Sequence, residues 1–509
     1  MFHYWRCILT MFLTAGACPA LADSNALPLV ELRWFEMRTA HFNIYSCGNP
    51  RDVYALAMSL EQFSDAYTLL GGAKQVASPP IIVMAFPDQE SVKPFLPLYQ
   101  GQPGNVSGFF KRGSDENLIV LALPGTNSIS TAMDIIFHEY AHLLFRRNAW
   151  IWPLWLSEGM AEIYSTFESD GRNVLIARPI AHHLSLLARE PLWPLAELFA
   201  VTPDSSQYNE RERQGMFYAE SWLLTHFLTA GDIPAYKMRF QQFTPLLRQG
   251  QVPEQAFTNA LQTALPVMDA ELARYLQRGR FAPIRLLLPA NVASATALNS
   301  REITPVETFF LLGNELLRID RLNEAESYFR QAQRRAPASP LPYEGLALLA
   351  ARREKHAEAL SELEEALTRG SISFLAHYLH AQEKYRLTAD SQGGYSPLKQ
   401  QELAALRGEL RKSIALMPNF APAHQLLGFL EMVQCEDLAL AEQELQLAIQ
   451  LEPDNPSYLL SLAQVQLRNK NAAAARRTLE PLLLPNVEST LRAHAREMLE
   501  EIGRERPGP

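Results

Sequence analysis

The stretch HEYAHLLFRRNAWIWPLWLSEGMAE, residues 138–162, decides how this chain is interpreted. His138 and His142 are four residues apart, so on a helix they lie on one face and can bind the same metal ion. Glu139 is rotated away from that face, where it can accept a proton from an attacking water molecule. The string therefore predicts a metal-binding helix over residues 131–146. The alternative is an ordinary amphipathic helix whose histidines have structural partners.

The residues on either side of the histidines favour the metal site. TAMDIIF precedes His138 and LLF follows His142, so the helix is expected to be buried. Two adjacent buried histidines cost free energy unless they have partners, and a metal ion would be such a partner. Asp134, one turn before His138, either orients an imidazole or is simply an acidic residue near the helix N-terminus.

A catalytic zinc ion needs a third protein ligand and an open position. The fifteen residues between His142 and Glu158 suffice to end one helix, bend at NAWIWP and begin an antiparallel helix. We therefore expect Glu158 to face the histidines, with Gly159 allowing the two helices to pack closely. Glu162, one turn later, is the rival ligand, and its other possible role is a hydrogen bond to a zinc-bound histidine.

HEYAH followed by WLSEGMAE resembles the gluzincin metallopeptidases, and the resemblance covers roughly residues 30–280. It implies an α+β zincin-like domain of the thermolysin type that hydrolyses peptide bonds. It also implies a Zn2+ ion held by His138, His142 and Glu158, with Glu139 as the general base.

Relatives in this group also use a tyrosine or histidine from a later helix to stabilise the oxyanion. The segment GMFYAESWLLTHFL supplies Tyr218 and His226, and Tyr218 matches the family better. The resemblance further implies that NLIVLAL, residues 117–123, is an edge strand that pairs with an extended substrate, although a plain core strand is equally consistent with it. No role is assigned to His182 and His183.

The segments around the motif predict strands first and helices afterwards, which is the order of an α+β domain. Before the motif, apolar alternation and turn residues predict two strands within 24–50, a helix over 52–70, a strand over 79–86 and a hairpin over 105–125. After it, apolar residues at helical spacing predict helices over 176–189, 213–229, 236–248, 253–263 and 267–279.

A different pattern begins near residue 306. Small residues and prolines recur with a period of 34 residues, which is typical of tetratricopeptide repeats. Five imperfect copies and a closing helix over 488–503 predict an all-α solenoid within 306–505. The segment 282–305, rich in Pro, Ala, Asn and Ser, is interpreted as a linker. The alternative to the solenoid is a generic helical bundle.

Residues 1–22 predict a secretory signal peptide, with an apolar run after Arg6 and small residues before Asp23. The mature chain is therefore expected to be periplasmic or secreted, and lipid attachment at Cys18 is a minor alternative. No other stretch has 18 consecutive apolar residues, so no membrane span is expected. Cys47 and Cys435 remain after cleavage, in different predicted domains, so no internal disulfide is expected.

Composition supports a globular protein and excludes a basic nucleic-acid-binding surface, since 48% of the 509 residues are hydrophobic and the net charge is −9. We predict an exported zinc metallopeptidase domain over 23–281 that acts on a protein or peptide substrate, with the repeats binding a protein partner. The alternative is a non-catalytic repeat scaffold that carries a structural or inactive zincin domain. A third possibility keeps the metal and cuts another amide, for instance in cell-wall peptide.

Overall fold

The computed structural model divides into two compact units, one formed by Ile151–Thr166 and Ala177–Ile284, the other by Pro28–Trp150, Phe167–Ile176 and Arg285–Pro509. The residues that it describes are 27–72, 81–99, 101–104, 106–113, 115–123, 129–146, 152–203, 205–209, 211–289, 299–388, 398–435, 437–484 and 487–504. The predicted signal peptide over 1–22, with Cys18, lies outside them. Among the described helices, none has the length and apolarity needed to cross a bilayer.

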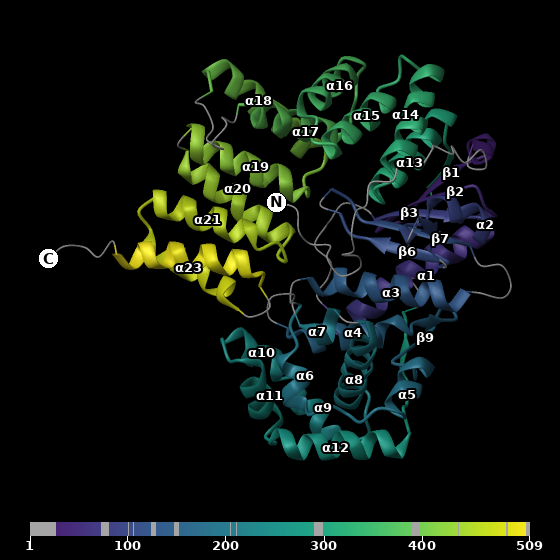
Figure 1. Ribbon diagram of the computed structural model, residues 1–509, viewed down its shortest axis with the longest axis vertical. Helices are drawn as coiled ribbons and strands as arrows, with labels where there is room; N and C mark the ends of the chain where they lie inside the picture. Colours follow the sequence, from purple (N-terminus) through teal and green to yellow (C-terminus); the bar gives the residue numbers. More distant parts are fainter. Residues whose placement is uncertain are drawn as a thin grey trace. The chain divides into compact units, whose positions relative to one another are not determined.

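A six-stranded mixed sheet forms the N-terminal part of the second unit (Figure 1). Its strand order is β11-β1-β2-β3-β7-β6, with β2, β3 and β7 parallel and the other neighbours antiparallel. The strands are β1 (Phe35–Arg38), β2 (Phe42–Ser46), β3 (Ile81–Phe86), β6 (Gly108–Lys111), β7 (Leu118–Ala122) and β11 (Asn299–Glu302). The predicted strand pair, buried strand and hairpin are therefore present.

Aromatic side chains fix the two helices that accompany this sheet, α1 (Pro50–Leu69) and α3 (Ile129–Phe145). The rings of Phe63 and Phe137 are stacked with centroids 4.7 Å apart, and Tyr140 meets Phe42 of β2 edge to face at 5.4 Å. Such contacts add to the burial of apolar area, so they stabilise the packing of the helix with the HEYAH string against α1 and the sheet.

Short strands also form outside the predicted strands. β9 (Asn173–Ile176) lies between β8 (Glu168–Ser169) and β10 (Ile284–Leu287), and a separate pair joins β4 (Leu98–Tyr99) to β5 (Gln102–Pro103). The predicted helix over 176–189 is consequently only α5, Ala181–Leu187. The segment predicted as a linker, 282–305, contains β10 and β11, and β11 pairs antiparallel with β1 in the register Phe35↔Glu302.

The first unit is helical. Its remaining helices are α4 (Leu154–Ser165), α6 (Leu195–Ala200), α7 (Ser206–Asn209), α8 (Arg211–Thr229), α9 (Pro234–Phe240), α10 (Phe243–Arg248), α11 (Pro253–Leu261) and α12 (Leu265–Arg278). A methyl group on Gly159 would lie 2.8 Å from the carbonyl carbon of Ser221 and would also collide with Thr225. Gly159 thus allows α4 to pack against α8, whereas the sequence had suggested that it serves the contact between the two motif helices.

Within its described residues, the C-terminal part forms five helical hairpins and a closing helix, as the repeat period predicts (Figure 1). The small residues at the predicted positions Ala325, Ala347 and Ala359 are fully buried, and Phe329 fills the space beside Gly313. The hairpins are α13 (Pro305–Arg318) with α14 (Leu322–Arg335), α15 (Leu341–Arg352) with α16 (His356–Thr368), α17 (Phe374–Arg386) with α18 (Gln400–Leu416), α19 (Ala421–Leu430) with α20 (Leu438–Leu451), and α21 (Ser457–Arg468) with α22 (Ala472–Leu479), followed by α23 (Ser489–Arg504).

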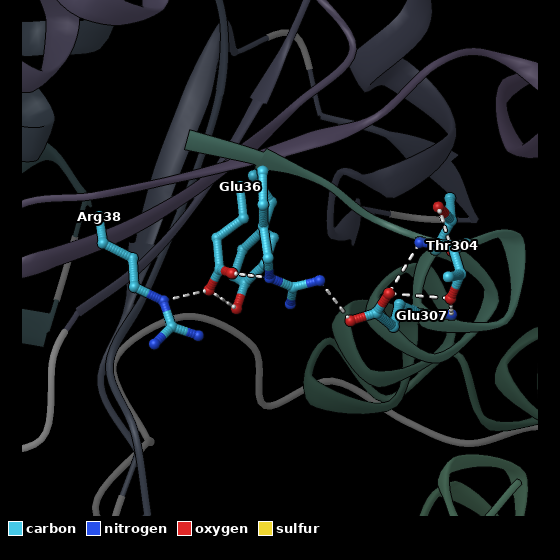
Figure 2. Close-up of polar contacts among 7 residues, drawn as sticks. Glu36, Arg38, Thr304 and Glu307 are labelled. Atoms are coloured by element: carbon cyan, nitrogen blue, oxygen red, sulfur yellow. Dashed lines mark hydrogen bonds and ion pairs between the residues drawn. The ribbon is translucent and has the colours of Figure 1, made fainter. Parts of the chain in front are cut away.

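The sheet is joined to the repeats by a buried carboxylate on β1 (Figure 2). Glu36 accepts hydrogen bonds from Arg38 at 2.7 Å and from Tyr45 at 2.9 Å, and Arg301 of β11 donates to its second oxygen at 2.6 Å. Burial alone would raise the pKa of Glu36, but these bonds and the two guanidinium charges outweigh burial and lower it. Glu36 therefore stays charged and anchors β11.

The same arginine continues the network into α13, the first repeat helix (Figure 2). Arg301 lies 2.8 Å from Glu307, whose other oxygen accepts hydrogen bonds from the backbone N–H and hydroxyl of Thr304. Thr304 and Glu307 form a capping box, which satisfies backbone donors at the helix N-terminus. The network thus connects a strand of the sheet directly to the start of the solenoid.

A second junction involves the turn after β6. Arg318 of α13 is only 13% exposed and lies 2.6 Å from Asp115 and 2.7 Å from Glu116, which also accepts a hydrogen bond from Asn314. Burial raises the pKa of Glu116 despite the neighbouring guanidinium, whereas Arg318 and backbone hydrogen bonds hold the pKa of Asp115 below its ordinary value. The positive charge of Arg318 is therefore balanced mainly by the ionised carboxylate of Asp115.

Candidate metal centre

The two motif histidines lie one above the other on α3, as the sequence predicts. Their rings have centroids 4.9 Å apart, and the two Nε2 atoms are 3.2 Å apart. Two ligands of a tetrahedral zinc ion with bonds of 2.0–2.1 Å are separated by about 3.3 Å. The spacing of His138 and His142 is therefore that of two nitrogen ligands to one ion.

Glu158, the expected third ligand, belongs to α4 and is only 4% exposed. One of its carboxylate oxygens accepts a hydrogen bond of 3.1 Å from the hydroxyl of Tyr208 on α7. A buried carboxylate is costly unless donors or a cation compensate its charge. Tyr208 supplies one donor, and a metal ion would supply the cation.

His138, His142 and Glu158 together form a group that could hold a metal ion. Each offers one ligand atom, and these atoms all lie within 4.8 Å of one another. Two imidazole nitrogens and one carboxylate oxygen are the donor set of many catalytic zinc sites, which keep a further position open. The residues present therefore fit zinc. Glu139 is half-buried on the same helix.

Glu162, the rival ligand, does not belong to this group. Its carboxylate lies 3.1 Å from the Nε2 atom of His183 on α5, and both side chains are largely buried. Sequence reasoning assigned no role to His183. Its partner lies twenty-one residues away on another helix, so helical periodicity gives no signal for this contact.

The two candidates for oxyanion stabilisation have different surroundings. Tyr218 on α8 is half-buried, and its ring stacks on that of Tyr208 with centroids 6.2 Å apart. Burial lowers the pKa of His226 to about 4, so this histidine is neutral. Its Nε2 lies 3.0 Å from the carbonyl of Ala177 and its Nδ1 lies 2.7 Å from the hydroxyl of Tyr275, which assigns it a structural role.

The strand within residues 117–123, which was predicted to be either an edge strand or a core strand, does not lie at the edge of the described sheet. β7, within 117–123, lies between β3 and β6 and is almost entirely buried, so it is a core strand. β6 ends the strand order on this side of the sheet. If an extended peptide adds to this side of the sheet, it pairs with β6.

Comparison with known proteins finds partial matches among solved structures only. No protein-family model matches the chain, and no curated protein matches it. Among solved structures, YrrB, described as a TPR protein with an unusual peptide-binding site, is similar to 37% of this chain and 90% of its own, at 16% identity and a TM-score of 0.30.

Two further solved structures match a comparable share of this chain. TTC0263, a thermophilic TPR protein of Thermus thermophilus, matches 38% of this chain and 99% of its own at 21% identity and a TM-score of 0.30. Pseudomonas aeruginosa pilF matches 39% of this chain and 89% of its own at 16% identity and a TM-score of 0.31. The helical hairpins in series and the 34-residue period of this chain support the predicted tetratricopeptide repeats, and the zincin-like assignment of the N-terminal part stays a prediction.

Proposed function

We propose that this chain is a protein-binding tetratricopeptide protein that also carries a zinc-dependent peptidase centre. The repeat fold supports the binding of protein partners. The observation that supports catalysis is the grouping of ligand atoms from His138, His142 and Glu158 within 4.8 Å, with a glutamate directly after the first histidine.

Each residue has a distinct task in this proposal. His138, His142 and Glu158 hold the ion, which when bound supplies Lewis acidity toward water and a substrate carbonyl. Glu139 accepts a proton as the water oxygen bonds to the peptide carbonyl carbon, and it returns the proton to the amine as the C–N bond breaks. Tyr218 is the proposed donor to the developing oxyanion.

A second function is favoured by the comparisons. The neighbours among solved structures are TPR proteins, and one of them is described as having a peptide-binding site. In this alternative the chain is a scaffold that binds protein through its repeats, and the zincin-like part is structural or inactive. An intact HEYAH string supports the peptidase, since a purely structural part has no need of Glu139.

Export is part of the proposal, because residues 1–22 have the charge and apolar pattern of a signal peptide. Sequencing the N-terminus of the protein purified from its native host tests this part. A mature chain that begins at Asp23 supports export, and a chain that still begins at Met1 contradicts it.

Metal content and hydrolysis separate the two functions. We expect the purified full chain to bind one zinc ion and to hydrolyse casein in a chelator-sensitive manner. His138→Ala should lose the zinc, whereas Glu139→Gln should keep it and lose at least about 100-fold in kcat, as expected for a general base. His494→Ala and Glu497→Gln, both exposed on α23, are the matched controls.

Each outcome decides between the candidates. Zinc that is bound and lost with His138→Ala, together with no hydrolysis of casein or cell-wall peptide, supports the scaffold with a structural metal. A folded wild-type protein that binds no zinc overturns both metal roles. Hydrolysis that survives Glu139→Gln contradicts the proposed base.

A further inference from the structure

A pocket lies where the end of α3, the turn after β6 and the repeats come together. All of its lining residues belong to the same compact unit. They are Arg112, Gly113, Asp115, Glu116, Asn117, Leu143, Arg146, Asn419, Leu451 and Glu452. The repeats therefore contribute one wall of this pocket, and the helix that carries His138 and His142 contributes another.

The charged side chains that line the pocket differ in how strongly they are paired within the protein. Asp115 and Glu116 are held by the buried Arg318, so they are not available to a ligand. Arg112, which directly follows β6, is 49% exposed and forms an ion pair with Asp454, in the turn between α20 and α21. Arg112 is thus a half-exposed guanidinium of the pocket, which Arg146 also lines.

Asp454 is an incompletely satisfied partner. Its side chain is only 3% exposed, and in the described structure its Oδ1 atom is buried without a hydrogen-bond partner. A buried carboxylate oxygen without a donor loses its hydration without compensation. The structure thus pairs Arg112 with a carboxylate that is itself incompletely hydrogen-bonded.

The pocket adjoins the proposed reaction centre. Leu143 directly follows His142, and Arg146 lies one helical turn further on. The negative charges of Glu452 and Glu139 stabilise the charged form of Arg112. The guanidinium is therefore within electrostatic reach of the proposed base.

We propose that Arg112 binds a carboxylate of the peptide substrate and that Asp454 occupies Arg112 when substrate is absent. This inference rests on the proposed peptidase function. The carboxylate comes from the C-terminus of the peptide or from an Asp or Glu side chain, because a guanidinium pairs with both in the same way. The fourth repeat thereby sets part of the substrate specificity.

Binding tests this inference without hydrolysis. Glu139→Gln is the background, and fluorescence anisotropy measures the Kd of three labelled peptides of one length. The first is neutral with a free C-terminus, the second is amidated with one Glu, and the third is neutral and amidated. We expect Arg112→Gln to weaken one or both carboxylate peptides at least about 10-fold, equivalent to roughly 1.4 kcal/mol, and to leave the third unchanged.

Asp454→Asn should have the opposite effect, tightening the same peptides severalfold because the internal competitor is weakened. Arg352→Gln and Asp320→Asn are the matched controls, since these two residues form an exposed ion pair within the repeats. Arg112→Lys keeps the positive charge but cannot form the bidentate hydrogen bonds of a guanidinium to a carboxylate, so it should retain part of the affinity. Unchanged binding of the neutral amidated peptide by Arg112→Gln shows that a loss for the other peptides is not a folding defect.

The peptides separate the two sources of the carboxylate. Loss confined to the free-C-terminus peptide identifies terminal recognition, and loss confined to the amidated Glu peptide identifies side-chain recognition. Equal Kd values for all three peptides with and without Arg112 overturn the inference, even if casein hydrolysis stands. Discrimination in the Glu139→Gln background, together with no hydrolysis of casein by the wild-type chain, supports the pocket and contradicts the peptidase.

Discussion

At the scale of single residues, the hydrogen bond from Tyr208 to Glu158 leads to the first prediction. A donor to a ligating carboxylate orients it, and removing such a donor typically costs 10–100-fold in metal affinity. Tyr208→Phe should therefore raise the zinc Kd at least about 10-fold while keeping the ring that stacks on Tyr218. Competition with a chelating dye measures this change.

Tyr218→Phe is the contrasting variant. If Tyr218 donates to the oxyanion, its loss should lower kcat by about 100-fold and leave the zinc Kd unchanged. Equal effects of the two substitutions on zinc affinity would contradict the separation of roles between the two tyrosines.

The buried Glu220 on α8 leads to a prediction about pH. Its Oε1 accepts a hydrogen bond of 2.5 Å from the backbone N–H of Trp193. Burial raises its pKa to about 8, and the nearby Glu197 and Asp269 add to the increase. An unfolded glutamate has a pKa of about 4.3. Between these values the folded state binds the extra proton, so stability should fall as pH rises from about 4.3 to 8.

Glu220→Gln keeps an acceptor for the Trp193 N–H and removes the titration. The variant should be less sensitive to pH than the wild type between pH 5 and 8, and more stable at pH 8. Thermal unfolding at several pH values measures both effects, with the exposed Glu497→Gln as the control. Identical pH profiles for the wild type and Glu220→Gln would show that this carboxyl does not carry a shifted proton.

The grouping of the two motif histidines could be predicted from the sequence because their spacing is local. His138 and His142 share one helix, so helical geometry alone places their rings together. Tyr208 lies fifty residues from Glu158, and His183 lies on a different helix from Glu162. Such contacts depend on tertiary packing, which neither periodicity nor a local motif encodes.

At the scale of secondary-structure elements, the close packing of α4 on α8 at Gly159 gives another prediction. Gly159→Ala places a methyl group against Ser221 and Thr225, and overpacking of this kind costs about 1–3 kcal/mol. Gly215→Ala, on α8 in the same unit, meets only the side chain of Leu186 at 3.4 Å. It should be neutral or stabilising by up to about 1 kcal/mol.

Urea unfolding followed by tryptophan fluorescence measures both substitutions, because the buried Trp155 and Trp222 lie on these two helices. A Gly159→Ala variant as stable as Gly215→Ala would mean that α4 and α8 separate without cost.

The long elements were predictable and the short ones were not. The apolar run of β3 and the turn of the β6–β7 hairpin gave clear signals, as did the recurring small residues of the repeats. β8 has only two residues, and β11, with the sequence NSRE, is exposed throughout. A polar strand that pairs through its backbone has no alternation of apolar residues, so 282–305 was interpreted as a linker.

At the scale of the whole molecule, the buried Arg318 joins the sheet to the first repeat. Removing one partner of a buried ion pair typically costs about 3–5 kcal/mol, because the other charge stays buried. Arg318→Gln leaves Asp115 in this position and should strongly lower the midpoint of thermal unfolding. Arg352→Gln, which breaks an exposed pair with Asp320, should change stability by less than about 1 kcal/mol. Similar effects of the two variants would show that the junction at Arg318 is not buried in solution.

The return of the chain to the sheet at β11 has a consequence for how the protein can be divided. A fragment that stops at Leu288 keeps β1 but lacks β11, which pairs with the outer edge of β1. It also lacks Arg301, which donates a hydrogen bond to Glu36. The separated N-terminal fragment would expose an open backbone edge and a buried charge, both of which promote aggregation. Coexpressed halves should therefore rescue each other's solubility, and genetic truncation would need to retain residues through at least Glu302.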